Sequence, residues 1–133
     1  MPKTILVQDP DVLISLDLAQ TVMEAWPDAS VILCRDVPQV VETLTNGQRP
    51  NLLILNQSLR SVRGFGLTRL VQHPQTKLLL TGADDGDAAE IAALGWHALD
   101  MPFSAAQVRE TLHDVCPDMD RRVQSHCNAI GIR

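Results

Sequence analysis

Short apolar runs alternate along the chain with longer segments in which apolar residues recur every three or four positions. The runs lie at Thr4–Val7, Ser30–Cys34, Asn51–Leu55, Lys77–Thr81 and about His97–Leu99. Nearly continuous apolar runs of this length are typical of strands that are buried on both faces of a parallel sheet. The pattern therefore predicts five strands, with a helical segment after each of them.

The helical segments have recognisable starts and ends. The first is predicted from Asp11 to Ala25, ended by Trp26-Pro27-Asp28, with a buried stripe of Leu13, Leu16 or Ile14, Leu18, Val22 and Ala25. The second begins at the N-cap Asp36, has Pro38 in its first turn and ends at Asn46-Gly47. Both segments have the length and the capping residues of ordinary amphipathic helices.

Three further helices are predicted in the second half of the chain. One runs from Phe65 to Val71 and is ended by His73-Pro74. Another runs from Asp84 to Leu94, with acidic residues capping its start and Gly95 closing it. The last is capped by Ser104 and carries a buried stripe of Val108, Leu112 and Val115.

Repeated strand–helix alternation predicts an α/β fold, a doubly wound parallel sheet of five strands with helices on both faces. Ligands of such sheets bind outside the carboxyl ends of the strands. The candidate site residues therefore lie in segments 8–11, 56–63, 81–85 and 100–103.

Composition narrows the class of protein. The 133 residues fit one domain, expected over residues 1–116, and residues 117–133 follow as a tail or an extra helix. A net charge of −5 and 3% aromatic residues argue against a nucleic-acid partner, and no apolar run is long enough for a membrane span. Three cysteines cannot all pair within the chain, which favours a reducing compartment, so a cytoplasmic location is expected.

Five sequence segments at the predicted strand ends carry a family resemblance. They are ILVQDPDVLI, NLLILN, the Gly64 that stands eight residues after Asn56, LLLTGADD with its Thr81, and DMPF. In this order, over residues 3–115, the chain resembles the CheY-like receiver domains of two-component response regulators. The resemblance implies a flavodoxin-like (βα)5 fold and a cis peptide bond at Met101–Pro102, with Phe103 anchoring the turn.

The chain departs from the receiver pattern where the family does its chemistry. Asp9 matches the first acidic position, but Pro10 replaces the second, and Asp11 matches the less critical third. Asn56 stands at the phosphoacceptor position and Met101 replaces the lysine. An amide is a poor nucleophile and cannot form an acyl phosphate. The resemblance therefore implies a degenerate pseudo-receiver, which is not an enzyme and needs no cofactor.

Two alternatives remain open at the residual strand-end pocket, which comprises Asp9, Pro10, Asp11, Thr81 and Met101. Either Asp9, Asp11 and Asn56 hold a weakly bound Mg²⁺, or Asp9 serves only as a hydrogen-bond acceptor that fixes the loops. Thr81 is expected to bond to local backbone.

A third alternative concerns the loop that follows Asn56. Its polar residues Ser58, Arg60 and Arg63 either contact an anion or form a solvated surface.

The leading hypothesis is a phosphorylation-independent protein-interaction module in a two-component or phosphorelay pathway, with a signalling protein as its partner. The alternative is a sensor that binds a small molecule or an anion in the remodelled strand-end pocket. Phosphotransfer through another acceptor, Asp11 or Ser58, ranks last. In the family, the surface around the fourth helix commonly mediates contacts, so Ala89, Ala92, Ala93 and a partly exposed Trp96 are the predicted interaction face of a symmetric homodimer. An alanine-rich helix chosen for its propensity is the other reading.

Overall fold

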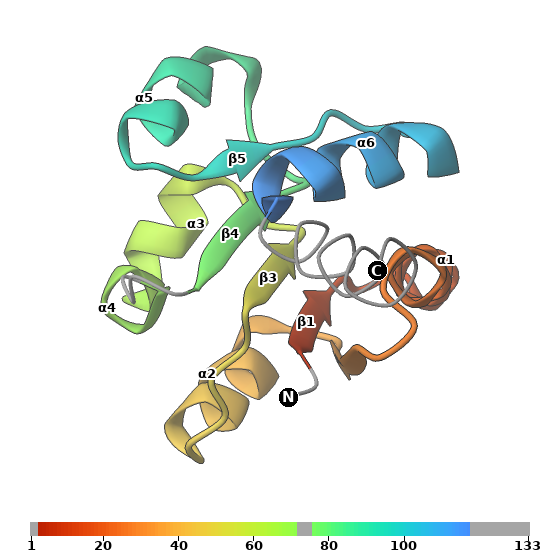
Figure 1. The fold of residues 1–133 in the computed structure, drawn as a ribbon. Coiled ribbons are helices and arrows are strands. Elements are labelled where there is room, and N and C mark those ends of the chain that lie inside the picture. The colour runs from red at the N-terminus through yellow and green to blue at the C-terminus, as the bar shows by residue number, and fades with distance from the viewer. Residues whose placement is uncertain (1–2, 72–75, 118–133) are drawn as a thin grey trace, which may run out of the picture.

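The computed structural model describes residues 3–71 and 76–117, and within them a single parallel sheet forms the centre of the fold (Figure 1). Its strands are β1 (Thr4–Gln8), β2 (Ser30–Cys34), β3 (Leu52–Leu55), β4 (Lys77–Leu80) and β5 (His97–Ala98). They are ordered β2-β1-β3-β4-β5 and all neighbouring pairs are parallel. This order confirms the prediction of a flavodoxin-like (βα)5 fold.

Helices cover both faces of the sheet. They are α1 (Val12–Ala25), α2 (Val37–Thr45), α3 (Leu59–Gly64), α4 (Leu67–Val71), the 3₁₀ turn η1 (Asp85–Asp87), α5 (Ala88–Ala93) and α6 (Ala105–Val115). Helices α1 and α6 pack side by side on one face, and the other helices lie on the opposite face (Figure 1). Within the described ranges, no helix combines the length and the apolar character that crossing a bilayer requires.

The core consists of two layers that the central strands separate. Because successive side chains of a strand point to opposite faces, Leu6 and Leu53 pack under α2 and α5, whereas Ile5 and Ile54 pack under α1 and α6. Every residue of β3 is buried. The continuous apolar runs of the sequence are therefore explained by burial on both faces.

The predicted stripe of α1 is partly wrong. Leu18 and Val22 are buried, but Leu13 is 73% exposed and Leu16 is 50% exposed. The stripe that contacts the sheet is instead made of Ile14, Leu18, Val22 and Ala25. A helix turns about 100° per residue, so Leu13 and Leu16 lie outside the narrow arc that one sheet face can cover.

The segment after β3 also differs from the prediction. It contains two short helices rather than one, because the Ser58 hydroxyl accepts a hydrogen bond from Ser61 N and starts α3 before Phe65. Phe65 then ends α3, and Gly66, with φ +69°, redirects the chain into α4. The predicted stop at 73–74 and the predicted tail beyond residue 117 lie outside the described residues.

The acidic segment 84–87 does not cap a helix as predicted. It forms η1, and neither Asp84 nor Asp87 makes a side-chain capping bond. The other caps are confirmed: Asp36 accepts from Gln39 N, and Ser104 forms a reciprocal capping box with Gln107.

The prediction of a partly exposed Trp96 is wrong, since this side chain is only 8% exposed. Gly95 has φ +78° and ends α5, and Trp96 N then donates to Ile91 O at 3.1 Å. This turn brings the indole back beneath its own helix, where it joins the core cluster of Ile91 and Leu80. Burial of the large apolar indole ring is favourable, and the turn at Gly95 makes it possible.

The corrected orientation of α1 predicts a contrast between two leucines of the same helix. Leu18→Ala should lower the free energy of unfolding by about 2–5 kcal/mol, because it leaves a cavity against the sheet. Leu13→Ala should change it by less than about 0.5 kcal/mol, because that side chain is already in water. Urea unfolding followed by circular dichroism measures both. Equal losses in the two variants would contradict the assigned face.

Candidate functional site

The carboxyl ends of β1, β3 and β4 meet at one edge of the sheet and form the candidate site. Gln8 is level with Leu55, and Leu55 is level with Leu80. The strands continue to pair one step further, because Asn56 N donates to Gln8 O and Thr81 N donates to Leu55 O, both at 2.9 Å. The register therefore places Asp9, Asn56 and Thr81 side by side, as expected for a doubly wound sheet.

The carboxylate of Asp9 is the centre of this site. The residue is 2% exposed, and its Oδ1 accepts from Asp11 N at 2.8 Å. Its Oδ2 accepts from the Asn56 side-chain Nδ2 at 3.2 Å. A buried carboxylate is costly unless hydrogen bonds compensate it, and here an amide and a backbone N–H do so. The bond from Asn56 links the ends of β1 and β3, as the prediction of Asp9 as a hydrogen-bond acceptor expects.

A second side-chain bridge, between Gln8 and Gln57, runs beside the first and was not predicted. Gln57 Nε2 donates to Gln8 Oε1 at 3.0 Å, and Gln8 Nε2 donates to the backbone oxygen of Arg35 at 3.1 Å. Gln8 is buried, so the two bonds satisfy an amide that water does not reach. The signal in the sequence was a glutamine at the end of one apolar run and a second just after another.

Gly82 closes the site from the β4 side. A Cβ atom at this position would lie 2.5 Å from Asn56 Oδ1 and 3.0 Å from Gln57 N. The glycine is needed because the backbone after β3 approaches so closely. Beside it, Thr81 is buried and its hydroxyl donates to Leu55 O at 3.5 Å, so its partner is the neighbouring strand rather than the predicted local backbone.

The remaining residues of the predicted strand-end pocket have other roles. Asp11 accepts from Leu13 N at 2.9 Å and caps α1, and Pro10 is exposed beside it. Met101 borders a hollow between α1 and α6, whereas Asp9 borders a smaller hollow between α1 and β2. The peptide bond at Met101–Pro102 is cis, as expected.

The three residues of the predicted anion contact lie at the start of α3 and along it. Ser58 uses its hydroxyl on Ser61, and Arg63 forms an ion pair with Glu90 at 2.6 Å. Arg60 is exposed on α3. These side chains lie on a short helix rather than on the loop that the sequence suggested.

The small hollow beside Asp9 measures about 210 Å³ and is bordered by Leu33, Cys34 and Arg35 of the neighbouring segment. Burial raises the pKa of the Cys34 thiol above its usual range, which keeps the sulfur protonated at neutral pH. No group of three or more metal-ligating side chains comes together within residues 3–71 and 76–117.

Comparisons with known proteins define the class of fold. No family model matches the sequence, and no curated protein matches it. Solved structures do match, and most are response regulator receiver domains. The architecture is therefore that of the CheY-like receiver fold.

Three similar structures illustrate this likeness. A receiver protein from Burkholderia phymatum has a TM-score of 0.66 at 16% identity, covering 89% of this chain and 95% of that chain. The chemotaxis response regulator CheY4 of Vibrio cholerae has a TM-score of 0.63 at 17% identity, covering 86% and 99%. A proposed pilus assembly-related protein from Burkholderia pseudomallei has a TM-score of 0.66 at 18% identity, covering 86% and 90%. At these identities the likeness is one of fold.

The lack of space at Gly82 predicts that alanine substitutions at Gly82 and at Gly86 have different effects on stability. Gly82→Ala should lower the free energy of unfolding by about 1–3 kcal/mol, because the new methyl group displaces the Asn56 amide and breaks its bond to Asp9. Gly86→Ala, where a Cβ would have no neighbour within 4 Å, is the matched control and should be nearly neutral. Thermal unfolding compares them. A Gly82→Ala protein as stable as its control would show that the strand ends are not closed.

Proposed function

We propose that this chain is an atypical receiver-fold signalling module that acts by contact with a signalling protein and without aspartyl phosphorylation. The observation that supports it best is the state of Asp9. Both oxygens of this buried carboxylate are already bound, one by the Asn56 amide and one by Asp11 N. A network that pairs one carboxylate with a side-chain amide and a backbone N–H therefore stands where a receiver would coordinate a metal and carry a phosphoryl group.

The donor set argues against metal-assisted phosphotransfer. Mg²⁺ prefers near-octahedral coordination by oxygen, with one or two carboxylates among its ligands. At this edge of the sheet, Asp11 is engaged as the cap of α1, and Asn56 contributes its N–H₂ group to Asp9. Binding of the ion would require the amide to leave Asp9 and turn its oxygen, which lies so near Gly82 that even a Cβ atom at that position would clash with it. The same crowding disfavours the alternative of a strand-end sensor.

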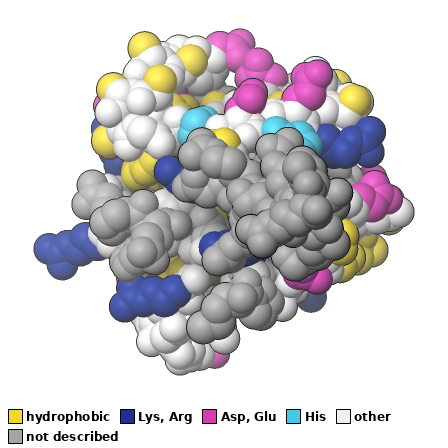
Figure 2. Space-filling view, in the orientation of Figure 1, with side chains coloured by type: hydrophobic (Ala, Val, Ile, Leu, Met, Phe, Trp, Pro, Cys, Tyr) yellow, Lys and Arg dark blue, Asp and Glu magenta, His cyan; other side chains and the backbone are white. Residues whose placement is uncertain are grey.

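For the partner surface we propose the exposed side of α5. Ala89, Ala92 and Ala93 are exposed there, and Figure 2 shows hydrophobic atoms gathered at the corner where Figure 1 places α5. Small side chains permit close approach of another helix, and a symmetric homodimer would bury the same patch twice. The buried Trp96 is no longer part of this face. We also propose a reducing compartment such as the cytoplasm, where a free cysteine such as Cys34 is maintained as a thiol.

The first prediction of this proposal is chemical inertness. Incubation with acetyl phosphate and Mg²⁺ should leave the intact mass unchanged, because Asn56 offers no carboxylate to phosphorylate. Intact-protein mass spectrometry measures this. A base-labile gain of one phosphoryl group would contradict the proposal.

Reconstruction of the site supplies the control. Asn56→Asp alone should restore little labelling, because Pro10 and Met101 remain and because the new carboxylate faces that of Asp9. The triple variant with Pro10→Asp, Asn56→Asp and Met101→Lys should label measurably. Labelling of the single variant at the level of the triple variant would refute the account of the site.

The proposed α5 face predicts a charge-sensitive dimer. Ala92→Arg should weaken self-association at least about tenfold, because it places two like charges across a symmetric contact. Light scattering at micromolar concentration measures the mass. Gln48→Arg, on the exposed turn after α2, adds the same charge elsewhere and should leave the mass unchanged. A wild-type protein that is monomeric, or equal masses for both variants, would remove α5 from the proposal.

A further inference from the structure

A cavity of about 450 Å³ lies between α1, the β5–α6 connection and α6, apart from the bridged strand ends. Its apolar lining includes the buried Leu18 and Val108, the half-buried Ile14 and Phe103, and Met101, which is 42% exposed. Cavities of about 300–1,000 Å³ with an apolar lining and a few polar groups are typical small-molecule sites. The space is therefore sufficient for a compact ligand with an aliphatic or aromatic body.

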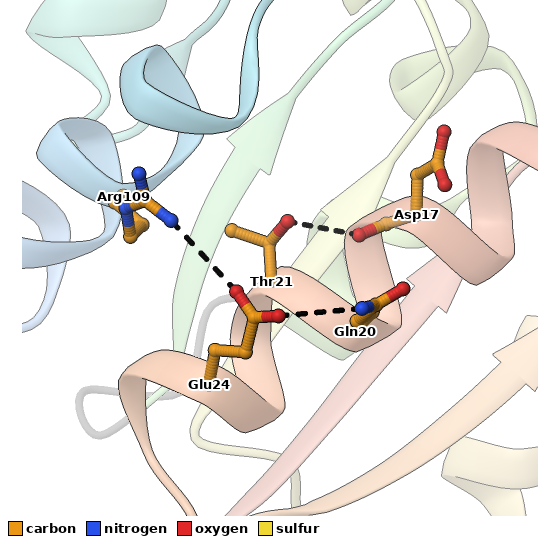
Figure 3. A network of polar contacts seen from close by, with 5 residues as sticks. All are labelled: Asp17, Gln20, Thr21, Glu24 and Arg109. Carbon is orange, nitrogen blue, oxygen red and sulfur yellow. Dashed lines mark hydrogen bonds and ion pairs between the residues drawn. The ribbon is translucent and has the colours of Figure 1, made fainter.

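The polar part of the lining comes from α1 and is acidic. Asp17, Gln20, Thr21 and Glu24 line the cavity on successive turns of this helix. Glu24 faces Arg109 of α6 at 3.8 Å, with about half of each side chain exposed, and this loose pair lies beside the cavity (Figure 3). The geometry is that of a weak, solvent-screened ion pair.

Asp17 is the uncompensated charge. Its backbone oxygen accepts from the Thr21 hydroxyl at 2.9 Å, but its carboxylate makes no hydrogen bond or ion pair with any residue in the described ranges, and it stands apart from the Arg109–Glu24 pair in Figure 3. A negative charge next to an apolar cavity favours a ligand that carries a positive charge.

The hydrogen bonds of the neighbouring side chains also favour a positively charged ligand. The Thr21 hydroxyl is committed to Asp17 O, and Gln20 Nε2 donates to Glu24 at 3.3 Å. The Thr21 donor and one of the two Gln20 N–H donors are therefore in use, whereas the carboxylate oxygens of Asp17 remain available to accept. At Met101, where the receiver pattern has a lysine, a polarisable thioether borders the cavity instead of an ammonium group that would repel a cation.

From this combination we propose that the cavity between α1 and α6 is a binding site for a small organic cation, a protonated amine carried on an apolar body. The ammonium group lies at Asp17, and the body fills the space among Leu18, Phe103 and Val108. The site is separate from the strand-end network and does not depend on the proposed signalling role.

The test uses phenethylammonium as the probe, with 2-phenylethanol as the neutral analogue and phenylacetate as the anionic one. Amide shifts of the full chain are followed by nuclear magnetic resonance. The cation should shift amides of α1 and of segment 101–108 and should bind most tightly, the alcohol more weakly and the anion least.

Two variants and a control distinguish the contribution of the Asp17 charge from that of the shape of the cavity. Asp17→Asn should weaken binding of the cation by up to about fivefold and leave the alcohol unaffected, because only the charge is removed. Ala105→Trp, at an exposed position on the cavity wall, should reduce binding of both by filling the space. Glu42→Gln, on α2 across the sheet, removes one exposed carboxylate elsewhere and should change neither affinity.

The spectrum of each variant also reports whether it is folded. Equal affinities for the cation and the alcohol would overturn the proposal. So would an unchanged affinity of the cation in Asp17→Asn, or shifts confined to other segments.

Discussion

Burial of β1, β3 and β4 on both faces is the constraint on which the rest of this protein depends. Strands that are covered on both sides must pair through their whole length, because an unpaired backbone group in the core would cost as much as a lost hydrogen bond. The register that results brings the ends of these strands level. Asp9, Asn56 and Thr81 are neighbours for this reason, whatever chemistry they perform.

At the ends of these strands, side-chain amides continue the hydrogen bonding between strands that the backbone provides. Asn56 joins β3 to the carboxylate of Asp9, and Gln57 joins the same loop to Gln8. Each amide has donors as well as acceptors, so it satisfies a buried acceptor without introducing a charge. A second carboxylate at position 56 would have repelled Asp9 in the absence of a cation. The network thus satisfies the buried carboxylate of Asp9 by hydrogen bonds alone.

Because hydrogen bonds close the strand ends, the exposed side chains that are available for binding lie on the helices. The exposed groups lie on α5, with its alanines, and on α1, with Asp17 beside a cavity. Met101 borders this cavity beside α1 and contributes a neutral thioether to its lining.

Local features of the fold were predictable from the sequence because they depend on neighbouring residues. The strands, the caps at Asp36 and Ser104 and the glycine-ended α5 follow from short-range patterns of burial and backbone preference. The exposure of Leu13 and Leu16 and the burial of Trp96 did not follow. The hydrophobicity of a residue shows only that its side chain favours burial. Which side chains are covered depends on how the helix or turn packs against the sheet.

In the candidate site, too, the sequence determines some features and the tertiary structure determines others. The sequence by itself determined which residues follow the predicted strands, an amide at Asn56 and a methionine before Pro102. Only the tertiary structure decided what these residues do, since Asn56 meets Asp9 from 47 positions away and Gln57 meets Gln8 from 49 positions away. Contacts of this kind depend on strand register and on the close approach at Gly82, which are properties of the assembled sheet and not of any local segment.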